Sequence, residues 1–161
     1  LILLDSHHAS WEDKIVTTEV KFMEITANTI QPVNAGSHVL FTETVIPGNC
    51  SMIHNDGSGL ITLRGLTNQC RARFRVSFTA NVAAPTGSPP PALSLAIATN
   101  GEPITSTTAI ITPAAANQYQ NVTLMNYIDV PRGCCTQLSI KNISSVTASI
   151  ANANLLVERV A

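Results

Sequence analysis

The sequence is poor in charge, in aromatic residues and in long apolar runs. Only 12% of its 161 residues are charged, where a typical soluble domain has about 25%. A monomer in water normally carries more charge on its surface than this. A weakly charged surface rich in Thr, Asn and Ala fits a subunit that buries much of itself against copies or neighbours. It fits a neutral extracellular β-domain as well.

The scarcity of aromatic and basic residues argues against nucleic-acid binding. Phe, Trp and Tyr together make up 4% of the chain, too few to form platforms on which bases stack. No stretch forms a basic patch. The longest apolar run at the start, Leu1–Leu4, ends at Asp5 and is far too short for a signal segment or a membrane span. The absence of an initiator Met indicates a processed or incompletely represented N-terminus.

Cysteine is also too sparse to define the fold. Four cysteines do not build a disulfide framework for a chain of this length. Zinc sites use spaced pairs, and the adjacent Cys134 and Cys135 would point to opposite faces of a strand. We therefore expect free thiols, with a Cys50–Cys70 bridge as the alternative, and no metal site.

One stretch, residues 71–83, organises the rest of the chain. Its even-numbered residues are all apolar and include Phe74, Val76 and Phe78, while its odd-numbered residues begin with Arg71, Arg73 and Arg75. Side chains of a strand alternate between two faces, whereas a helical period would scatter the three arginines around the axis. The pattern predicts a long strand with Phe74, Val76 and Phe78 in the core, covered by a second layer.

Short strands separated by turn residues follow throughout residues 35–161. Asn100-Gly101 is the strongest hairpin signal, because a type I′ turn needs positive φ at both central residues. No segment of residues 35–161 has the pattern of a helix of two turns. Besides 71–83, the expected strands are 37–46, 51–54, 60–64, 93–99, 102–112, 122–130, 136–143 and 150–160. This spacing is typical of a β-sandwich or barrel, and we expect the last strand to lie between two neighbours.

Residues 1–34 are interpreted as an N-terminal arm, and residues 35–161 as the head. Residues 1–24 hold five of the ten acidic residues of the chain. Trp11 and Phe22 are large apolar side chains in a polar stretch, so we expect them to anchor the arm on this head or on a neighbouring subunit. The alternative is an arm that packs on its own head as an extra edge strand.

Catalytic chemistry is not indicated by any motif. Histidines His38 and His54 lie beside strand ends, but no nucleophile, base and orienting residue share a segment. His54-Asn55-Asp56-Gly57 is better explained as a turn. The acidic residues of the head each stand alone in their segment, and no glycine-rich loop precedes a helix. The sequence predicts a protein that is not an enzyme and binds no cofactor.

Three stretches resemble the tumour-necrosis-factor/C1q-like jelly roll. They are Ser58–Gly65, Leu95–Ile104 with its Asn-Gly turn, and the closing apolar strand Asn154–Ala161. Within that group the chain is similar to the C-terminal domain of collagen-like exosporium glycoproteins and to related phage and prophage structural proteins of Firmicutes. The resemblance covers about residues 35–161. It implies an all-β jelly-roll head that forms a homotrimer around one sheet edge, for which Phe41, Tyr119 and Tyr127 are the candidate interface residues.

The functional hypothesis is a non-enzymatic virion structural protein. We expect a trimeric head that decorates or cements a bacteriophage capsid, contacts the major capsid protein or other virion subunits, and is held by its N-terminal arm. The alternative is the receptor- or glycan-binding head of a phage fibre or of a bacterial collagen-like surface filament, which would bind cell-surface glycan and lie outside the cell. Neither hypothesis involves a nucleic acid or a membrane.

Overall fold

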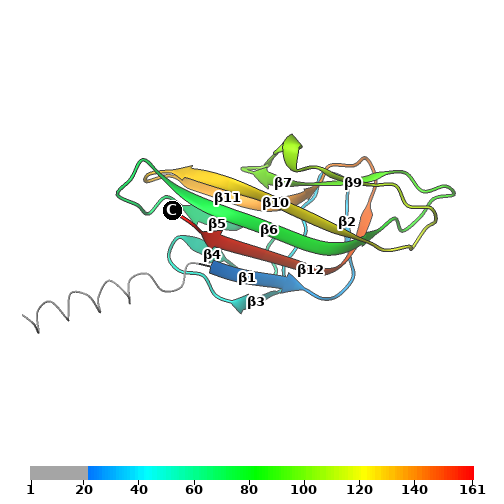
Figure 1. The fold of residues 1–161 in the computed structure, drawn as a ribbon. Coiled ribbons are helices and arrows are strands. Elements are labelled where there is room, and N and C mark those ends of the chain that lie inside the picture. Colours follow the sequence, from blue (N-terminus) through cyan, green and yellow to red (C-terminus); the bar gives the residue numbers. More distant parts are fainter. Residues whose placement is uncertain (1–21) are drawn as a thin grey trace, which may run out of the picture.

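Two antiparallel sheets packed face to face form the protein in a computed structural model, which describes residues 22–161 (Figure 1). The first sheet, sheet A, has the strand order β10-β6-β12-β1-β3, with β2 also paired to β12. Its strands are β1 (Phe22–Ala27), β2 (Gln31–Val33), β3 (Glu43–Ile46), β6 (Arg71–Ala83), β10 (Gln120–Pro131) and β12 (Ala148–Arg159). The long strands β6, β10 and β12 lie side by side in this layer.

The second sheet, sheet B, covers the inner face of sheet A. Its strand order is β4-β5-β11-β7-β8, with β9 paired to β7. Its strands are β4 (Met52–His54), β5 (Ile61–Arg64), β7 (Leu93–Thr99), β8 (Glu102–Pro103), β9 (Ala109–Ile111) and β11 (Cys135–Asn142). One short 3₁₀ turn, Thr105–Thr107, joins β8 to β9. No helix of residues 22–161 has the length and apolar character needed to span a membrane.

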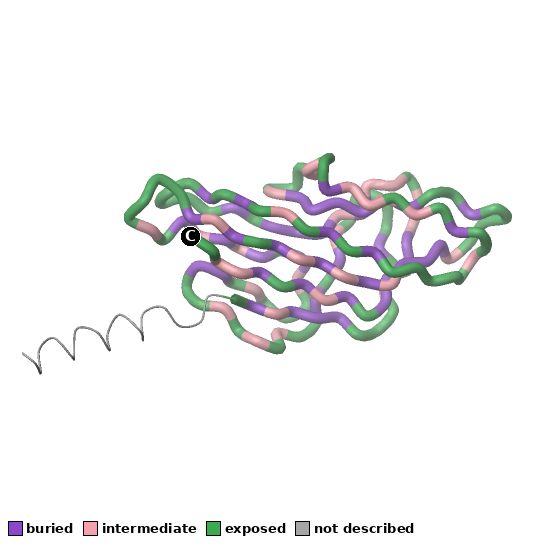
Figure 2. Tube along the Cα trace, viewed as in Figure 1, coloured by how far each residue is buried: buried purple, intermediate pink, exposed green. Residues whose placement is uncertain are grey.

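Strand β6 has the bounds and the alternation that the sequence predicts. Figure 2 shows buried and more exposed positions alternating along the strands of sheet A. Phe74, Val76 and Phe78 have no exposed surface, whereas Arg71 and Arg75 on the opposite parity are exposed. The buried side of β6 faces sheet B, so one layer of apolar side chains between the sheets forms the core.

The hairpin and the final strand were also predicted correctly. Asn100 and Gly101 both have positive φ, 52° and 83°, and they connect β7 to β8. Strand β12 lies between β6 and β1 in the middle of sheet A. An inner strand is hydrogen-bonded on both sides, so the C-terminal segment is part of the core of the fold.

The boundary between arm and head differs from the predicted one. Residues 22–33 contribute β1 and β2 to sheet A, and β1 lies between β12 and β3. Met23 and Ile25 of β1 are buried in the core. The boundary at residue 34 is therefore wrong, because the apolar alternation of β1 needs the sheet to bury it. Trp11 and the rest of residues 1–21 lie outside the described residues.

The expected strand 37–46 is also shorter than predicted. Only Glu43–Ile46 forms a strand, β3, and Val45 is exposed although its parity predicted burial. The pairing of β3 with β1 skips Val45, which is the extra residue of a bulge, so its side chain does not follow the alternation of the strand. Val39 is nevertheless buried.

Phe41 is a correction to the predicted interface. Its side chain has no exposed surface and packs edge-on against Phe78, with ring centroids 6.2 Å apart. A side chain buried inside the sandwich cannot line a contact with another copy. Phe41 therefore contributes to the core of the monomer, where edge-to-face aromatic pairs add to the free energy of burial.

The parity of β6 can be tested by comparing two substitutions on one strand. Phe74→Ala should lower the free energy of unfolding by ~3–5 kcal/mol, because it leaves a cavity in a close-packed core. Thr79→Ala, on the solvent face of the same strand, should change it by less than ~0.5 kcal/mol. Denaturant unfolding at one fixed protein concentration measures both values. Equal effects of the two substitutions would contradict the assignment.

Candidate functional site

The candidate site is the solvent face of sheet A, where outward side chains from four strands lie in rows. Cross-strand pairing places residues of β10, β6, β12 and β1 opposite one another. The first row consists, in that strand order, of Tyr127, Arg75, Glu158 and Phe22. The second row consists of Met125, Ser77, Leu156 and Glu24. Side chains directly opposite each other are close enough to interact, so each row acts as a unit.

The first end of this face carries ion pairs. Arg73 donates two hydrogen bonds to the Asp129 carboxylate, Nε to Oδ1 at 2.7 Å and Nη2 to Oδ2 at 3.1 Å. The Nε atom of Arg71 lies 3.1 Å from Oδ2 of the same carboxylate. The hydrogen bond from Arg73 lowers the pKa of Asp129 below its ordinary value, with a smaller contribution from the charges of Arg73 and Arg71.

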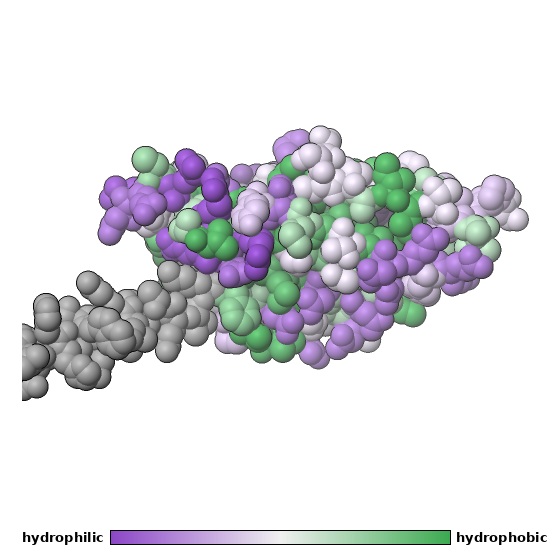
Figure 3. Space-filling view, viewed as in Figure 1, coloured by the Kyte–Doolittle hydropathy of each residue, from purple (hydrophilic) through white to green (hydrophobic). Residues whose placement is uncertain are grey.

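The positive charge at this end exceeds the negative charge. Arg75 forms an ion pair with Glu158 across the strands β6 and β12. Among the described residues at this end, three arginines thus face the two carboxylates of Asp129 and Glu158, and the carboxylate of Glu24 lies one row further along. Figure 3 shows the most hydrophilic residues gathered over the end of this face nearest the C-terminus. The excess favours anionic groups in whatever lies against it.

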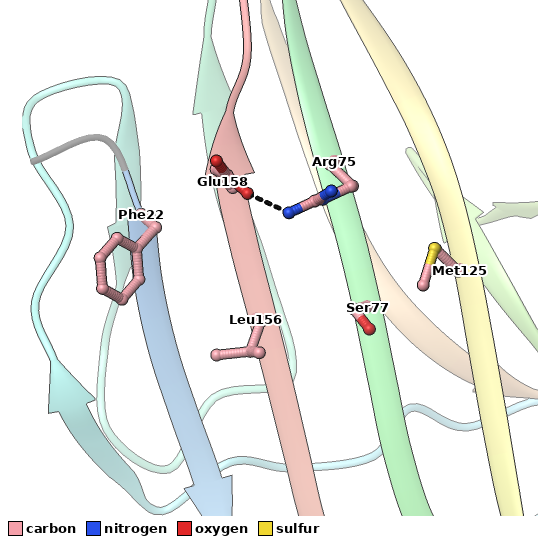
Figure 4. Close-up of a pocket in the computed structure, with 6 residues that line it drawn as sticks. All are labelled: Phe22, Arg75, Ser77, Met125, Leu156 and Glu158. Atoms are coloured by element: carbon pink, nitrogen blue, oxygen red, sulfur yellow. Dashed lines mark hydrogen bonds and ion pairs between the residues drawn. The ribbon is translucent and has the colours of Figure 1, made fainter.

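A shallow hollow of about 490 Å³ lies next to the ion pairs. Ser77 has a small side chain and lies among larger lining side chains from the three other strands (Figure 4). The hollow is lined by Phe22, Arg75, Ser77, Met125, Leu156 and Glu158. The arrangement places an apolar depression directly beside a charged rim.

The opposite end of the face is uncharged and rich in amides. Asn121 of β10 donates a hydrogen bond to the side-chain oxygen of Asn81, at 3.4 Å, and Asn81 donates one to Asn152, at 3.3 Å. This ladder crosses β10, β6 and β12. The face therefore changes from charged to apolar to neutral polar along the direction of the strands.

The two tyrosines of the chain are both associated with the edge strand β10. Tyr127 lies within β10 and is 57% exposed, and Tyr119 directly precedes the strand and is 42% exposed. Phe22 lies in the lining of the hollow and is 42% exposed. These predicted residues are thus on the surface of sheet A or at its edge, unlike Phe41, Phe74, Val76 and Phe78 in the core.

Three residues of this face were missed from the sequence, although a signal was present. Leu155 and Leu156 are adjacent in one strand, so one of them has to point outward, and Leu156 does. Met125 shares the outward parity of Tyr127 in β10. Ser77 is the small residue between larger ones on the polar side of β6. Only the pairing of the strands brings the three together.

One group of residues contains a hydroxyl, an imidazole and a carboxylate, but its arrangement is not that of a catalytic triad. The Thr44 hydroxyl donates to Asp56 at 2.7 Å and lies 3.1 Å from Nδ1 of His54. The other ring nitrogen, Nε2, lies 2.9 Å from the carbonyl oxygen of Ser58, and the imidazole is fully buried. Because both ring nitrogens are engaged and the carboxylate contacts the hydroxyl, the group connects β3 to the turn after β4.

The described residues also lack the clusters that hold metal ions. Within residues 22–161 no three His, Cys, Asp or Glu side chains lie close enough to share an ion. The four cysteines are exposed and free, so the Cys50–Cys70 bridge is not formed in this structure.

A second depression, of about 570 Å³, lies beside the segment that leads into β3. Its lining includes the exposed side chains Leu40 and Leu60 together with uncharged polar residues such as Asn34 and Ser37. Burial lowers the pKa of His38 in this lining, and the charge of Lys141 lowers it further. A neutral imidazole leaves this groove uncharged.

The solved structures that resemble this chain decide the fold. The globular domain of zebrafish complement 1qA protein superposes with a TM-score of 0.57 at 10% identity, over 85% of this chain and 94% of that one. Murine APRIL superposes with a TM-score of 0.60 at 8% identity, over 87% of this chain and 99% of that one. The chain has the tumour-necrosis-factor/C1q-like jelly-roll fold.

The jelly roll was predicted correctly, and its narrower resemblances stay predictions. No protein-family pattern and no curated protein matches the sequence. About a tenth of the residues are identical between this chain and those structures. Such a low identity shows a common fold and does not show a common function. The resemblance to exosporium glycoproteins and phage proteins is therefore carried by the sequence motifs alone.

The ion pair of Asp129 predicts how stability changes in acid. Its pKa is lowered in the folded state, so its contribution is present above about pH 4, the range of an unfolded aspartate, and is lost as the pH falls through the folded pKa. The parent protein should thus lose more stability between pH 5 and 2 than Asp129→Asn. Thermal melts across this range measure the difference, and Arg73→Gln should flatten the profile in the same way. Parallel profiles for parent and variants would contradict this assignment.

Proposed function

We propose that this jelly roll is a non-enzymatic head that assembles into a homotrimer through the edge strand β10. The observation that carries the proposal is the character of this strand. β10 is 12 residues long and, among the described strands, pairs with β6 alone, so its other side is an open edge of the described sheet. Met125 and Tyr127 on its outward face are 60% and 57% exposed.

A long open edge with apolar side chains promotes association of a soluble monomer. Its unpaired backbone N–H and C=O groups can pair with strands of other molecules, and native proteins cover or shorten such edges. A neighbouring copy that covers β10 with a different patch makes a heterologous contact, and three such contacts can close a ring. The low charge of the chain supports this reading, because a surface buried between copies needs few charges.

A light-scattering experiment on Tyr127→Glu tests the trimer. The parent should have the mass of three chains at micromolar concentration. The variant should shift toward the monomer, since burying an extra carboxylate in a contact is unfavourable. The new glutamate would lie opposite Arg75, so the monomer itself should stay folded. Ile53→Glu, at a residue 42% exposed on β4 at the far edge of sheet B, is the matched control and should remain a trimer. A monomeric parent would refute the proposal.

The setting that we propose for this trimer is the surface of a bacteriophage capsid, with residues 1–21 as the part that contacts the major capsid protein. Support comes from the phage-like sequence motifs, the low charge and the acidic, Trp-containing start of the chain. Residues 22–33 contribute β1 and β2 to sheet A and are therefore unavailable for this attachment.

A second candidate function, glycan binding by a fibre head, is favoured by the uncharged groove beside β3. Leu40 and Leu60 offer apolar surface there, while Asn34, Ser37 and Ser58 offer amide and hydroxyl groups. Neutral sugars present the same combination of apolar faces and hydroxyls. A fibre head of this kind would be present in few copies and would lie outside the cell.

Mass spectrometry of purified particles separates the two settings by copy number. A decoration protein should be present in hundreds of copies on the heads, and a fibre head in a few copies on the tails. A chain that begins at Lys21 keeps every described strand, so it should fold and yet fail to bind heads stripped of the protein. Binding as strong as that of the full chain would show that residues 1–20 are not the anchor.

A further inference from the structure

The hollow over Ser77 has the features of a docking surface for one large apolar side chain with acidic neighbours. Phe22, Met125 and Leu156 around it are 42%, 60% and 38% exposed, so their apolar surface is only partly covered by the head itself. Figure 4 shows these side chains around the small Ser77, with Arg75 and Glu158 on one side. An aromatic ring placed there would cover apolar surface contributed by three strands.

The charged residues at the rim of the hollow indicate which charge its occupant carries. Arg71 and Arg73 share the single carboxylate of Asp129, and Glu158 neutralises only Arg75. The end of the face with Arg71 and Arg73 thus has one positive charge more than Asp129 neutralises, while the carboxylate of Glu24 lies in the row of Ser77 and Leu156. An occupant that pairs an aromatic side chain with one or two carboxylates would match the hollow and the rim together.

We propose that the occupant is the segment Trp11-Glu12-Asp13 of the same chain, with the indole in the hollow and the two carboxylates toward the arginines. Trp11 is the only tryptophan of the sequence, and two acidic residues follow it directly. The proposal goes beyond the trimer and the capsid role. It concerns the free head before attachment, so it can be tested without a capsid and independently of the capsid role.

The place where the described chain begins favours this occupant over a separate molecule. Phe22, the first described residue, is itself part of the lining. Ten residues separate Trp11 from Phe22, and they can span up to about 35 Å. A tether of this length gives an effective concentration in the millimolar range, which exceeds that of free protein at micromolar concentration.

The indole would find both kinds of contact that it needs. Its rings would cover Leu156 and Met125, and a buried tryptophan typically removes about 150–250 Å² from water. Its N–H group needs an acceptor, and the Ser77 hydroxyl or the Glu158 carboxylate lies in the lining. The guanidinium of Arg75 at the rim could also interact with the face of the ring.

Binding of this segment would give the arm two alternative partners. In the free head it would shield the hollow, and on a particle it would contact the capsid instead. The two states would therefore compete for the same side chains. Met125 lines the hollow and also lies on the outward face of β10, so a neighbouring copy is the competing occupant of the hollow.

Intrinsic fluorescence tests the proposal in the full chain, because Trp11 is the only tryptophan. In the parent the emission should be blue-shifted, and quenching by acrylamide should be several-fold weaker than in the urea-unfolded protein. Ser77→Leu fills the hollow from below and should shift the emission to the red and raise the quenching toward the unfolded value. Thr62→Leu makes a comparable change on the outer side of β5 in sheet B and should leave both readings unchanged.

A second variant keeps the test valid if Ser77→Leu affects folding. The double variant Glu12→Gln/Asp13→Asn alters no described residue and should raise the quenching of Trp11. In the parent, 1 M salt should have a similar effect, since the screening length falls to ~3 Å. Two results would overturn the proposal. One is that Trp11 of the parent is quenched as strongly as in the unfolded chain. The other is that Trp11 is weakly quenched in the parent and equally weakly in both variants. Light scattering on the same samples shows whether a neighbouring copy covers the hollow instead. If Ser77→Leu loses the trimer while Trp11 is exposed in every sample, the hollow belongs to the neighbouring copy. That result would also overturn the proposal.

Discussion

The register of β6 between β10 and β12 is the constraint on which the rest of the structure depends. Burial of Phe74, Val76 and Phe78 against sheet B fixes which side of β6 points inward. Because the side-chain period of a strand is two, a slip by one residue would turn every side chain to the other face. The apolar core thus determines that Arg75 and Ser77 point to solvent, although neither contributes to that core.

The solvent face of sheet A follows from this register. Arg75 meets Glu158 and Ser77 meets Leu156 only because β6 and β12 pair with one particular offset. A bulge between Ala151 and Asn154 of β12 changes this offset toward the other end of the strand. At that end the amide ladder through Asn152 replaces the ion pairs. One sheet therefore presents three different surfaces: an arginine-rich end, an apolar hollow and a neutral polar end. Such a division suits a face that meets more than one partner.

Within the described residues, one group of side chains contains the types of residue that form a catalytic triad. The one grouping of hydroxyl, imidazole and carboxylate in the described residues, around His54, is buried and hydrogen-bonded within the protein. Its contacts join β3 to the turn after β4. The solved structures that resemble this chain share its fold, and identity of about a tenth transfers no role or partner. The open edge of β10 and the hollow are therefore the features from which function was inferred.

The sequence alone determined the elements whose signals are local. The alternation in residues 71–83 predicted β6 with its bounds, and Asn100-Gly101 predicted the hairpin, because parity and positive φ are properties of short stretches. The motifs at residues 58–65, 95–104 and 154–161 predicted the jelly roll. The orientation of Tyr127 on an outward face also follows from its parity within β10.

Only the tertiary structure decided what depends on pairing between distant segments. Phe41 and Tyr127 are both aromatic residues in strand-like sequence, yet one is buried against Phe78 and the other lies exposed on the edge strand. Residues 22–33 were assigned to the arm from the sequence and become part of sheet A because β12 and β3 lie on either side of β1. The hollow joins residues from four strands that are up to 136 positions apart, from Phe22 to Glu158. No local pattern carries such information, since the burial of an apolar side chain is set by whichever strand the fold brings beside it.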